Sequence, residues 1–271
     1  MADLLTDQAL NELELSDREF IRYSRQVMLE QWNEQGQLTL KKAKVVIIGC
    51  GGLGNIAASF LAGAGVGQLV LVDDDCVELS NLPRQLAFEE GDIENAKALA
   101  LANRLREQNE HIEVVAQTQR FDADDAHHLF NQADLVLDCT DNFATRYALN
   151  HSCVAHAIPL LSASVIGWQG QLLLVDPNQM DYGCYQCLFD SAQDSAANCT
   201  TSGVSGAAVG IIASYQANEA IRYLLGQRSS LASSLLLIDS QSLQNQILKR
   251  AYDENCSICN APRQKENVNV D

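Results

Sequence analysis

A glycine-rich turn constrains this chain more than any other stretch. Four apolar residues at 45–48 run directly into the letters GCGGLG. An apolar strand, glycines at this spacing and a following helix together present backbone N–H groups to a phosphate. Asp73 ends the next apolar run, about 20 residues on, where an acid can bind a ribose hydroxyl. The turn predicts a nucleotide-binding α/β fold, shaped by Gly49, Gly51, Gly52 and Gly54.

The first half of the chain alternates strand and helix patterns. Apolar runs predict strands at 44–48, 67–75, 112–117 and 133–142, and helical spacing covers 55–64 and 93–108. This rhythm predicts a Rossmann-like sheet whose strands are parallel and joined by right-handed crossovers. A helix over 18–32 is expected before it, with Phe20, Tyr23, Val27 and Met28 as its apolar positions.

The second half is predicted to be more elaborate and partly antiparallel. Two strands flank a turn at 167–170, a polar loop covers 180–203, a helix covers 204–225 and a hairpin closes 233–250. We expect residues 1–17 to form an acidic lead-in, residues 18–260 a single domain and residues 261–271 a disordered tail. The fold class is therefore α/β.

Composition limits the classes of partner. The net charge of −17 disfavours nucleic acid and anionic membranes as partners. The N-terminus lacks a secretory signal, and the most apolar later stretch is interrupted by polar residues, so no membrane span is expected. Nine cysteines without a signal favour the reducing cytoplasm, where thiols serve as metal ligands or reactants.

Charged residues beyond the strands favour ATP over a dinucleotide. Arg84 and Lys97 follow the second strand, and a triphosphate needs such cations more than a dinucleotide does. Asp138 and Asp141 end the fourth strand, where an acid can face a polyphosphate if Mg²⁺ lies between them. Two alternatives stay open: an NAD(P)-dependent oxidoreductase, which has no use for Arg84 or Lys97, and a non-catalytic binding module.

Two cysteine pairs predict a metal site. Cys184 and Cys187 form one C-x-x-C pair, and Cys256 and Cys259 form another. Four thiolates arranged in this way satisfy tetrahedral Zn²⁺ and leave no open position, so the predicted zinc is structural. Four further cysteines beside apolar segments are expected to be small core residues: Cys50, Cys76, Cys139 and Cys153.

Six motifs together resemble the ThiF/MoeB/HesA family, the bacterial relatives of ubiquitin-activating enzymes. They are GCGGLG, VDDDCVELSNLPRQ, LDCTDN, GCYQC, NCTTSGV and CSIC, in family order over about 18–259. The resemblance implies a homodimer that adenylates the C-terminal Gly-Gly carboxylate of a ubiquitin-like sulfur carrier. Pro83 departs from the family pattern, but the functional residues on both sides of it are kept.

The resemblance also implies roles for single residues. Asp73 would hold the ribose, Asp141 would bind Mg²⁺ and Arg25 would reach the partner subunit's ATP site. Cys199, in a polar loop ahead of a helix, would be the reactive thiol in sulfur transfer. The remaining residues expected around ATP are Asp75, Ser80, Asn81, Arg84, Gln85, Lys97 and Asn142.

Within the family, two biosynthetic pathways are possible for this chain. The letters GCYQCLF, ANCTTSGV and SASVIGWQGQL resemble the thiamine branch, which uses a ThiS-type carrier. The alternative is a MoaD-type carrier in molybdopterin biosynthesis. The chain stops soon after Cys259, so no rhodanese domain is expected to follow. A separate protein, such as a cysteine desulfurase, would then supply the sulfur.

Overall fold

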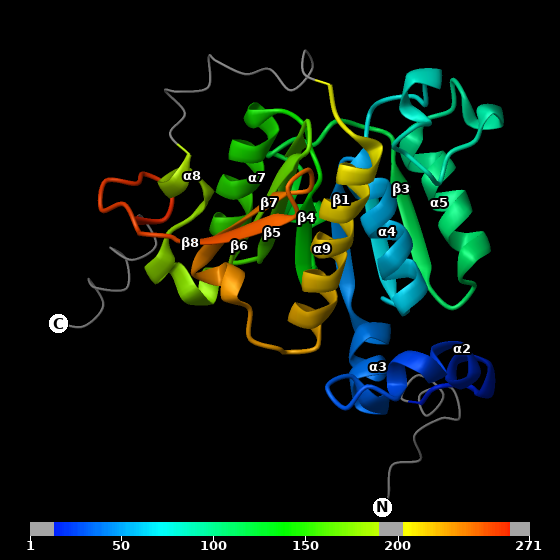
Figure 1. The fold of residues 1–271 in the computed structure, drawn as a ribbon. Coiled ribbons are helices and arrows are strands. Elements are labelled where there is room, and N and C mark those ends of the chain that lie inside the picture. Colours follow the sequence, from blue (N-terminus) through cyan, green and yellow to red (C-terminus); the bar gives the residue numbers. More distant parts are fainter. Residues whose placement is uncertain (1–13, 190–202, 261–271) are drawn as a thin grey trace, which may run out of the picture.

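The computed structural model describes residues 14–189 and 203–260 (Figure 1). The strands are β1 (Lys44–Ile48), β2 (Gln68–Val72), β3 (Glu113–Gln117), β4 (Leu135–Asp138), β5 (Leu160–Ile166), β6 (Gln169–Val175), β7 (Ser234–Asp239) and β8 (Gln244–Lys249). The α-helices are α2 (Asp17–Val27), α3 (Asn33–Lys42), α4 (Gly52–Ala64), α5 (Lys97–Gln108), α6 (Ala126–Leu129), α7 (Phe143–Ala155), α8 (Tyr185–Leu188) and α9 (Gly206–Leu224). No described helix combines the length and apolar character that crossing a bilayer requires.

All eight strands form one sheet in the order β3-β2-β1-β4-β5-β6-β7-β8. The first five pair in parallel, and β5 to β8 pair antiparallel, which confirms the predicted fold class. The chain order reverses between β1 and β4. In an open α/β sheet, such a reversal places a crevice at the carboxyl ends of the strands.

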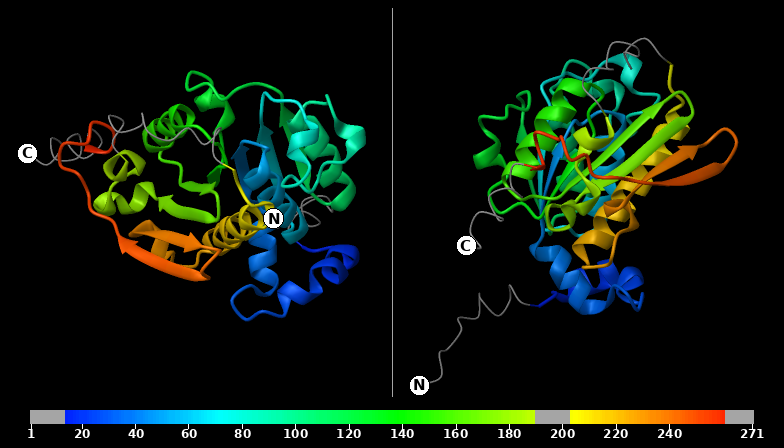
Figure 2. Two further views of the ribbon diagram at one scale, coloured as in Figure 1. Left: turned by 45° about the horizontal axis from the view of Figure 1, so that its top comes forward. Right: turned by 90° about the vertical axis from the view of Figure 1, so that its left-hand side faces the viewer.

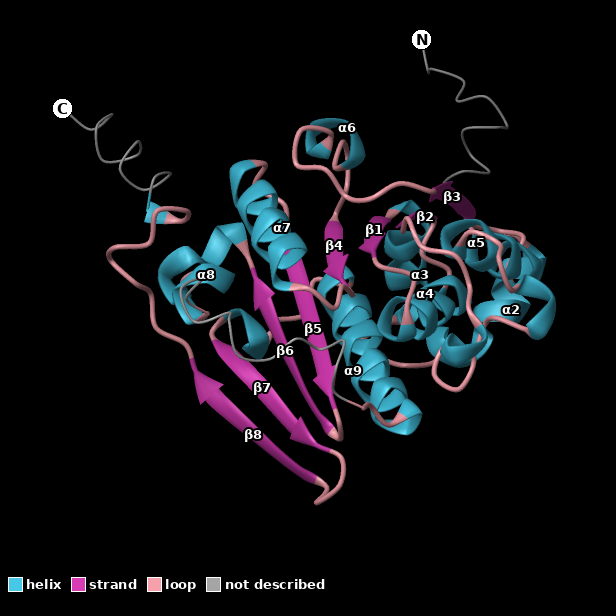
Figure 3. Cartoon of the chain, turned by 90° about the horizontal axis from the view of Figure 1, so that it is seen from above, coloured by secondary structure: helices cyan, strands magenta, loops and turns pink. Residues whose placement is uncertain are grey.

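Alternate strand residues enter two separate cores. In β1, Val45 and Ile47 join the core beneath α3, α4, α5 and α9, while Val46 and Ile48 join the core beneath α6, α7 and α8. This period of two explains why β1, β2 and β4 are almost entirely apolar, since both of their faces are covered, whereas the edge strand β3 is only partly buried. Figure 3 shows α9 on one side of β5 and β6, with α7 and α8 on the other. The β7–β8 hairpin projects beyond them (Figure 2).

The N-terminal helix differs from its prediction in length and in its buried face. It ends at Val27, and the separate helix α3 follows. Tyr23 is buried, as expected, but Phe20 and Met28 are 48% and 75% exposed, respectively. Glu19 is the other buried residue of α2, because its carboxylate completes a capping box with Ser16 and pairs with Lys41.

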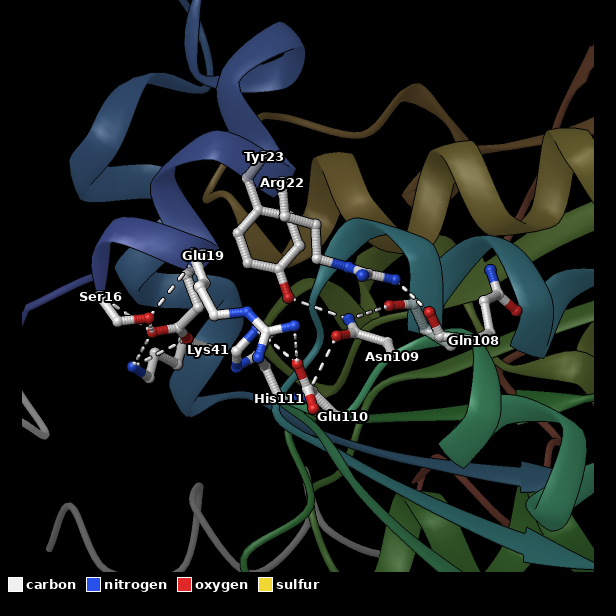
Figure 4. A network of polar contacts seen from close by, with 11 residues as sticks. Ser16, Glu19, Arg22, Tyr23, Lys41, Gln108, Asn109, Glu110 and His111 are labelled. Carbon is white, nitrogen blue, oxygen red and sulfur yellow. Dashed lines mark hydrogen bonds and ion pairs between the residues drawn. The ribbon is translucent and has the colours of Figure 1, made fainter.

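Polar contacts attach α2 to the body of the molecule (Figure 4). The Nδ2 of the fully buried Asn109 donates to the Tyr23 hydroxyl oxygen at 2.9 Å and to the Ala62 carbonyl at 2.7 Å. Arg22 donates to the backbone carbonyl of Gln108, the residue before Asn109. These bonds fix α2 beside the C-terminal end of α4.

Smaller differences concern element boundaries. The helix expected over 93–108 begins only at Lys97, because Ile93 and Ala96 are extended. Helix α7 was not expected, and the short helix α8 lies inside the predicted loop at 180–203. Residues 1–13 of the predicted lead-in at 1–17, and the predicted tail at 261–271, lie outside the described residues. The rest of the lead-in contains the Ser16 cap and the first residue of α2.

The Asn109 contacts generate a stability prediction. Asn109→Ala removes three side-chain hydrogen bonds, the two that its Nδ2 donates and the one that its Oδ1 accepts from the His111 N–H, so the free energy of unfolding should fall by about 2–4 kcal/mol. The control is Glu110→Ala, which removes an exposed ion pair with Arg18 and a 3.8 Å contact with the His111 ring and should cost at most about 0.5 kcal/mol. Urea denaturation of both variants tests this, and equal losses would contradict it.

Candidate functional site

The loops after β1 and β4 meet at the switch point of the sheet. Gly49 has φ of +93°, and a Cβ there would lie 2.8 Å from the Cys139 carbonyl oxygen. A Cβ on Gly54 would lie 1.8 Å from the Gly49 carbonyl oxygen, so neither position can carry a side chain. Helix α4 begins at Gly52 with no side-chain cap, which leaves its first N–H groups available to an anion.

A cavity of about 810 Å³ opens above these loops. This volume lies in the usual range for small-molecule sites. The structure brings most of the predicted nucleotide-binding residues together in its wall: Gly49, Gly51, Gly52, Asp73, Asp75, Asn81, Arg84, Gln85, Lys97, Asp141 and Asn142.

Hydrogen bonds hold the charged side chains of the cavity in place. The buried Lys97 Nζ lies 2.7 Å from Asp75 Oδ2, and Arg84 Nη1 donates to the Ser80 carbonyl at 2.9 Å. Asp73 accepts hydrogen bonds from the backbone N–H groups of Cys50 and Asp75. Burial raises the pKa of Asp73, and these two N–H donors oppose that rise.

Asp141 stands on a loop that a buried carboxylate organises. Asp138 is fully buried, and its Oδ1 accepts hydrogen bonds from the Thr140 hydroxyl and backbone N–H. Its Oδ2 accepts a hydrogen bond of 2.6 Å from the Ser162 hydroxyl. Asp138 therefore shapes the loop, while Asp141 is exposed in the cavity wall with its oxygens open to a ligand.

Three of the residues predicted to bind the nucleotide do not line the cavity. Gly54 sits behind the glycine turn, and Ser80 is exposed, where its carbonyl orients Arg84. Arg25 is on α2, whose Gln26 donates to the Ala64 carbonyl at the last residue of α4. Because α4 starts at the glycine turn and has 13 residues, its two ends lie about 20 Å apart. Arg25 is thus remote from the cavity of its own chain.

The sequence reasoning missed several cavity residues, of which Arg146 is the most consequential. Asn142 caps α7 through a hydrogen bond from the Thr145 N–H, and Arg146 follows in the first turn of that helix. Its Nη2 donates to the Thr140 carbonyl, and the residue is 5% exposed. The signal that could have located Arg146 is Asn142, a typical helix-capping residue that follows the fourth strand. Also missed were Asp74, Arg120 and Thr145.

A second hollow adjoins the nucleotide cavity. This groove of about 430 Å³ lies on one face of β5 to β8, with Phe143 and Arg146 of α7 in its wall. Strand pairing places its floor residues in two rows, Ile166–Gln169–Asp239–Gln244 and Ser164–Gln171–Leu237–Gln246. Helix α9 packs on the opposite face, where Ile212 meets Gly170. The groove therefore stays open along the sheet.

The four cysteines of the two C-x-x-C pairs meet in the core. Their sulfur atoms all lie within 4.8 Å of one another, with 3.7 Å between Cys184 and Cys256 and 3.4 Å between Cys187 and Cys259. Four thiolates around tetrahedral Zn²⁺ would be about 3.8 Å apart. Hydrogen bonds from the Cys184 and Cys259 thiols lower the pKa of Cys187. This donor set fits zinc.

The remaining described cysteines fall into two groups. Cys50, Cys139 and Cys153 are buried, as predicted, and burial raises the pKa of each thiol. Cys76 was expected in the core, but it is exposed and lines the nucleotide cavity, because β2 ends four residues before it. Cys199 lies outside the described residues.

Comparison with known proteins finds a matching family and several similar relatives. The ThiF family matches residues 23–258. The sulfur carrier protein ThiS adenylyltransferase of Escherichia coli is 44% identical over 245 residues, which cover 90% of this chain and 97% of that protein. The adenylyltransferase and sulfurtransferase MOCS3 of Caenorhabditis briggsae is 40% identical, over 88% of this chain and 60% of that protein.

Solved structures repeat the fold. The crystal structure of E. coli MccB with ATP superposes with a TM-score of 0.76 at 26% identity, covering 88% of this chain and 73% of that chain. The family match spans most of the chain. The chain belongs to the ThiF family and is a nucleotidyltransferase, an adenylyltransferase in its chemistry.

Proposed function

We propose that this enzyme adenylates the C-terminal carboxylate of a ThiS-type sulfur carrier. The observation that carries this proposal is the meeting of the two hollows. Asp141, Arg146 and Ile166 line both the nucleotide cavity and the groove on the sheet. An extended, narrow protein tail lying in the groove would bring its end to the nucleotide. The E. coli ThiS adenylyltransferase, which matches over nearly its whole length, supports the carrier type.

The reaction follows from the charges around the cavity. An oxygen of the tail carboxylate attacks the α-phosphorus of ATP; that O–P bond forms while the bond to the β-phosphate oxygen breaks. Pyrophosphate leaves, and the tail is left as an acyl-adenylate. Arg84 and Lys97, which line the cavity, would neutralise the departing phosphates, so most of the rate enhancement would come from positioning and electrostatics.

Mg²⁺ would neutralise further phosphate charge, and Asp141 is the carboxylate best placed to hold it. The nearby carboxylates of Asp73 and Asp75 are already engaged, by backbone N–H donors and by Lys97 respectively. The carboxylate of Asp141 is exposed in the cavity wall. Oxygen ligands of this kind suit a hard divalent cation.

The position of Arg25 favours a homodimer. On its own chain it lies at the far end of α4 from the glycine turn. Around it, α2 and the following turn expose Phe20, Ile21, Met28 and Leu29, each at 48% or more. Apolar side chains gathered on one exposed helix are typical of an interface. A second copy packed there would bring Arg25 to the partner's nucleotide cavity.

A MoaD-type carrier is the second candidate, because MOCS3 proteins from several animals are 38–41% identical to this chain. In either case, sulfur from a separate donor would convert the acyl-adenylate into a thiocarboxylate. Cys199 stays our candidate for that transfer. Cys76 is the alternative among the described residues, since it is exposed in the nucleotide cavity.

Pyrophosphate exchange tests the adenylation. The wild type should exchange pyrophosphate into ATP only with a Gly-Gly-ended carrier, and faster with a ThiS-type than with a MoaD-type protein. Asp141→Ala should reduce exchange by about 10²–10³-fold, because Mg²⁺ loses its anchor. The control, Asp124→Asn, changes an exposed carboxylate outside the cavity and should exchange normally. Full exchange by Asp141→Ala would contradict the assignment.

Subunit mixing tests the role of Arg25. Arg25→Ala and Lys97→Ala homodimers should both be weak, because every site lacks one cation. In a heterodimer, one of the two sites keeps both residues, so an equal mixture should recover about a quarter of wild-type exchange. Native mass spectrometry would verify that subunits have exchanged. No recovery in verified heterodimers would place Arg25 outside the partner's site.

Metal analysis tests the zinc site. We expect one Zn²⁺ per chain in the freshly purified protein, and Cys256→Ser should lose it and unfold at a lower urea concentration, because zinc binding contributes to folding. Cys76→Ser is the matched control, since that exposed thiol lies outside the cluster and its loss should leave the metal in place. A zinc-free wild type would refute the site.

A further inference from the structure

Arg250 is a buried cation that lies outside both the nucleotide cavity and the groove. It directly follows β8 and is 7% exposed. Its Nη2 donates to the Leu174 carbonyl at 2.8 Å and to the Ala232 carbonyl at 2.6 Å, whereas Nε and Nη1 are buried without a hydrogen-bond partner. Within residues 14–189 and 203–260, no carboxylate forms an ion pair with it. A buried charge with unused donors is costly unless something compensates it.

The sheet topology brings Arg250 to the edge that carries the four zinc-ligand candidates. Strands β6 and β8 are both antiparallel to β7, so they run in the same direction and end at the same edge (Figure 3). The segment after β6 leads to Cys184, and the segment after β8 leads from Arg250 to Cys256. Val175, the residue after Leu174, packs in the same core as the cysteine cluster. The guanidinium is therefore anchored to the strand end from which the first cysteine pair departs.

The charges of the guanidinium and of the cysteine cluster are complementary. Burial lowers the pKa of Arg250 to about 10, and the sulfur atoms of Cys184 and Cys187 oppose this fall, so the side chain stays charged at neutral pH. Four thiolates and one Zn²⁺ leave two negative charges uncompensated. Taking such a charge out of water is unfavourable unless an opposite charge accompanies it. A buried arginine beside the cluster meets that need, and the cluster in turn compensates the arginine.

We propose that Arg250 is the counter-charge of the buried cysteine cluster and increases its affinity for Zn²⁺. This inference rests on the zinc site proposed above and extends it beyond the four ligands. Groups outside the ligand shell commonly change metal affinity by about 10–100-fold. In the metal-free protein the thiols are neutral, so the same buried guanidinium lacks its partner and is unfavourable. Arg250 therefore couples the folding of this edge of the sheet to the presence of the metal.

Zinc affinity, measured by competition with a chromophoric chelator, tests this role. Arg250→Gln removes the charge and keeps an amide donor, whereas Arg250→Lys keeps a positive charge. Arg250→Gln should bind Zn²⁺ about 10–100-fold more weakly than the wild type, and Arg250→Lys should lose less. The matched control is Lys249→Gln, which removes the same charge from the exposed neighbouring side chain and should stay within about twofold of the wild type.

Urea denaturation with and without zinc separates the counter-charge from a structural role. Our inference predicts that Arg250→Gln lowers the stability of the zinc-bound protein and leaves that of the metal-free protein unchanged or higher. If Arg250 served only to bind the Leu174 and Ala232 carbonyls, both forms would lose equally and zinc affinity would be unchanged, which would overturn the inference. If Arg250→Gln does not fold, Arg250→Met replaces it, because that side chain leaves no buried polar group.

Two further results complete the test. If the metal-free wild type is unfolded, the thiolate-to-metal charge-transfer band of the Co²⁺-substituted protein decides: it should move to longer wavelength in Arg250→Gln, and an unmoved band would contradict the counter-charge. A wild type without zinc would refute the zinc site and this inference together. Zinc bound equally tightly by the wild type and Arg250→Gln would keep the zinc site and overturn only the role of Arg250. Adenylation is tested separately, by pyrophosphate exchange.

Discussion

The whole site depends on one close backbone approach. Gly49 lies against the carbonyl of Cys139, so the loop after β1 touches the loop after β4 where the strand order reverses. A Cβ at Gly49 would separate them, and a Cβ at Gly54 would displace Gly49 itself. This contact places the start of α4 beside Asp141 and the start of α7. One crevice therefore receives N–H groups, a carboxylate and Arg146 together.

Most of the fold could be predicted from local patterns. Apolar runs predicted β1, β2 and β4, because strands covered on both faces are largely apolar. Helix α7 was missed because its residues are mixed in polarity: Asn150 and Arg146 are buried beside Leu149. The prediction of which face of α2 is buried was also wrong. Polar contacts from Tyr23 and Glu19, rather than its apolar residues, attach that helix to the body.

The site residues that belong to sequence motifs could be predicted from the sequence. Residues adjacent to strand ends, such as Asp73 and Asp141, were placed in the cavity by topology alone. The C-x-x-C spacing also identified the four zinc-ligand candidates, which lie together in the structure. Features that depend on three-dimensional packing could not be predicted from the sequence. They are the distance of Arg25 from its own cavity, the exposure of Cys76 and the position of Arg146, which all follow from how helices and loops pack on the sheet.

The central claim is that the tail's own carboxylate oxygen attacks the α-phosphorus. The most direct measurement is isotope transfer from a carrier whose C-terminal carboxylate carries ¹⁸O at both of its oxygen atoms. Incubation with ATP and Mg²⁺, followed by hydroxylamine to cleave the acyl-adenylate at its carbonyl carbon, releases AMP for mass spectrometry. We predict that the AMP phosphate contains one ¹⁸O atom. Label in inorganic phosphate, or AMP without label, would contradict it.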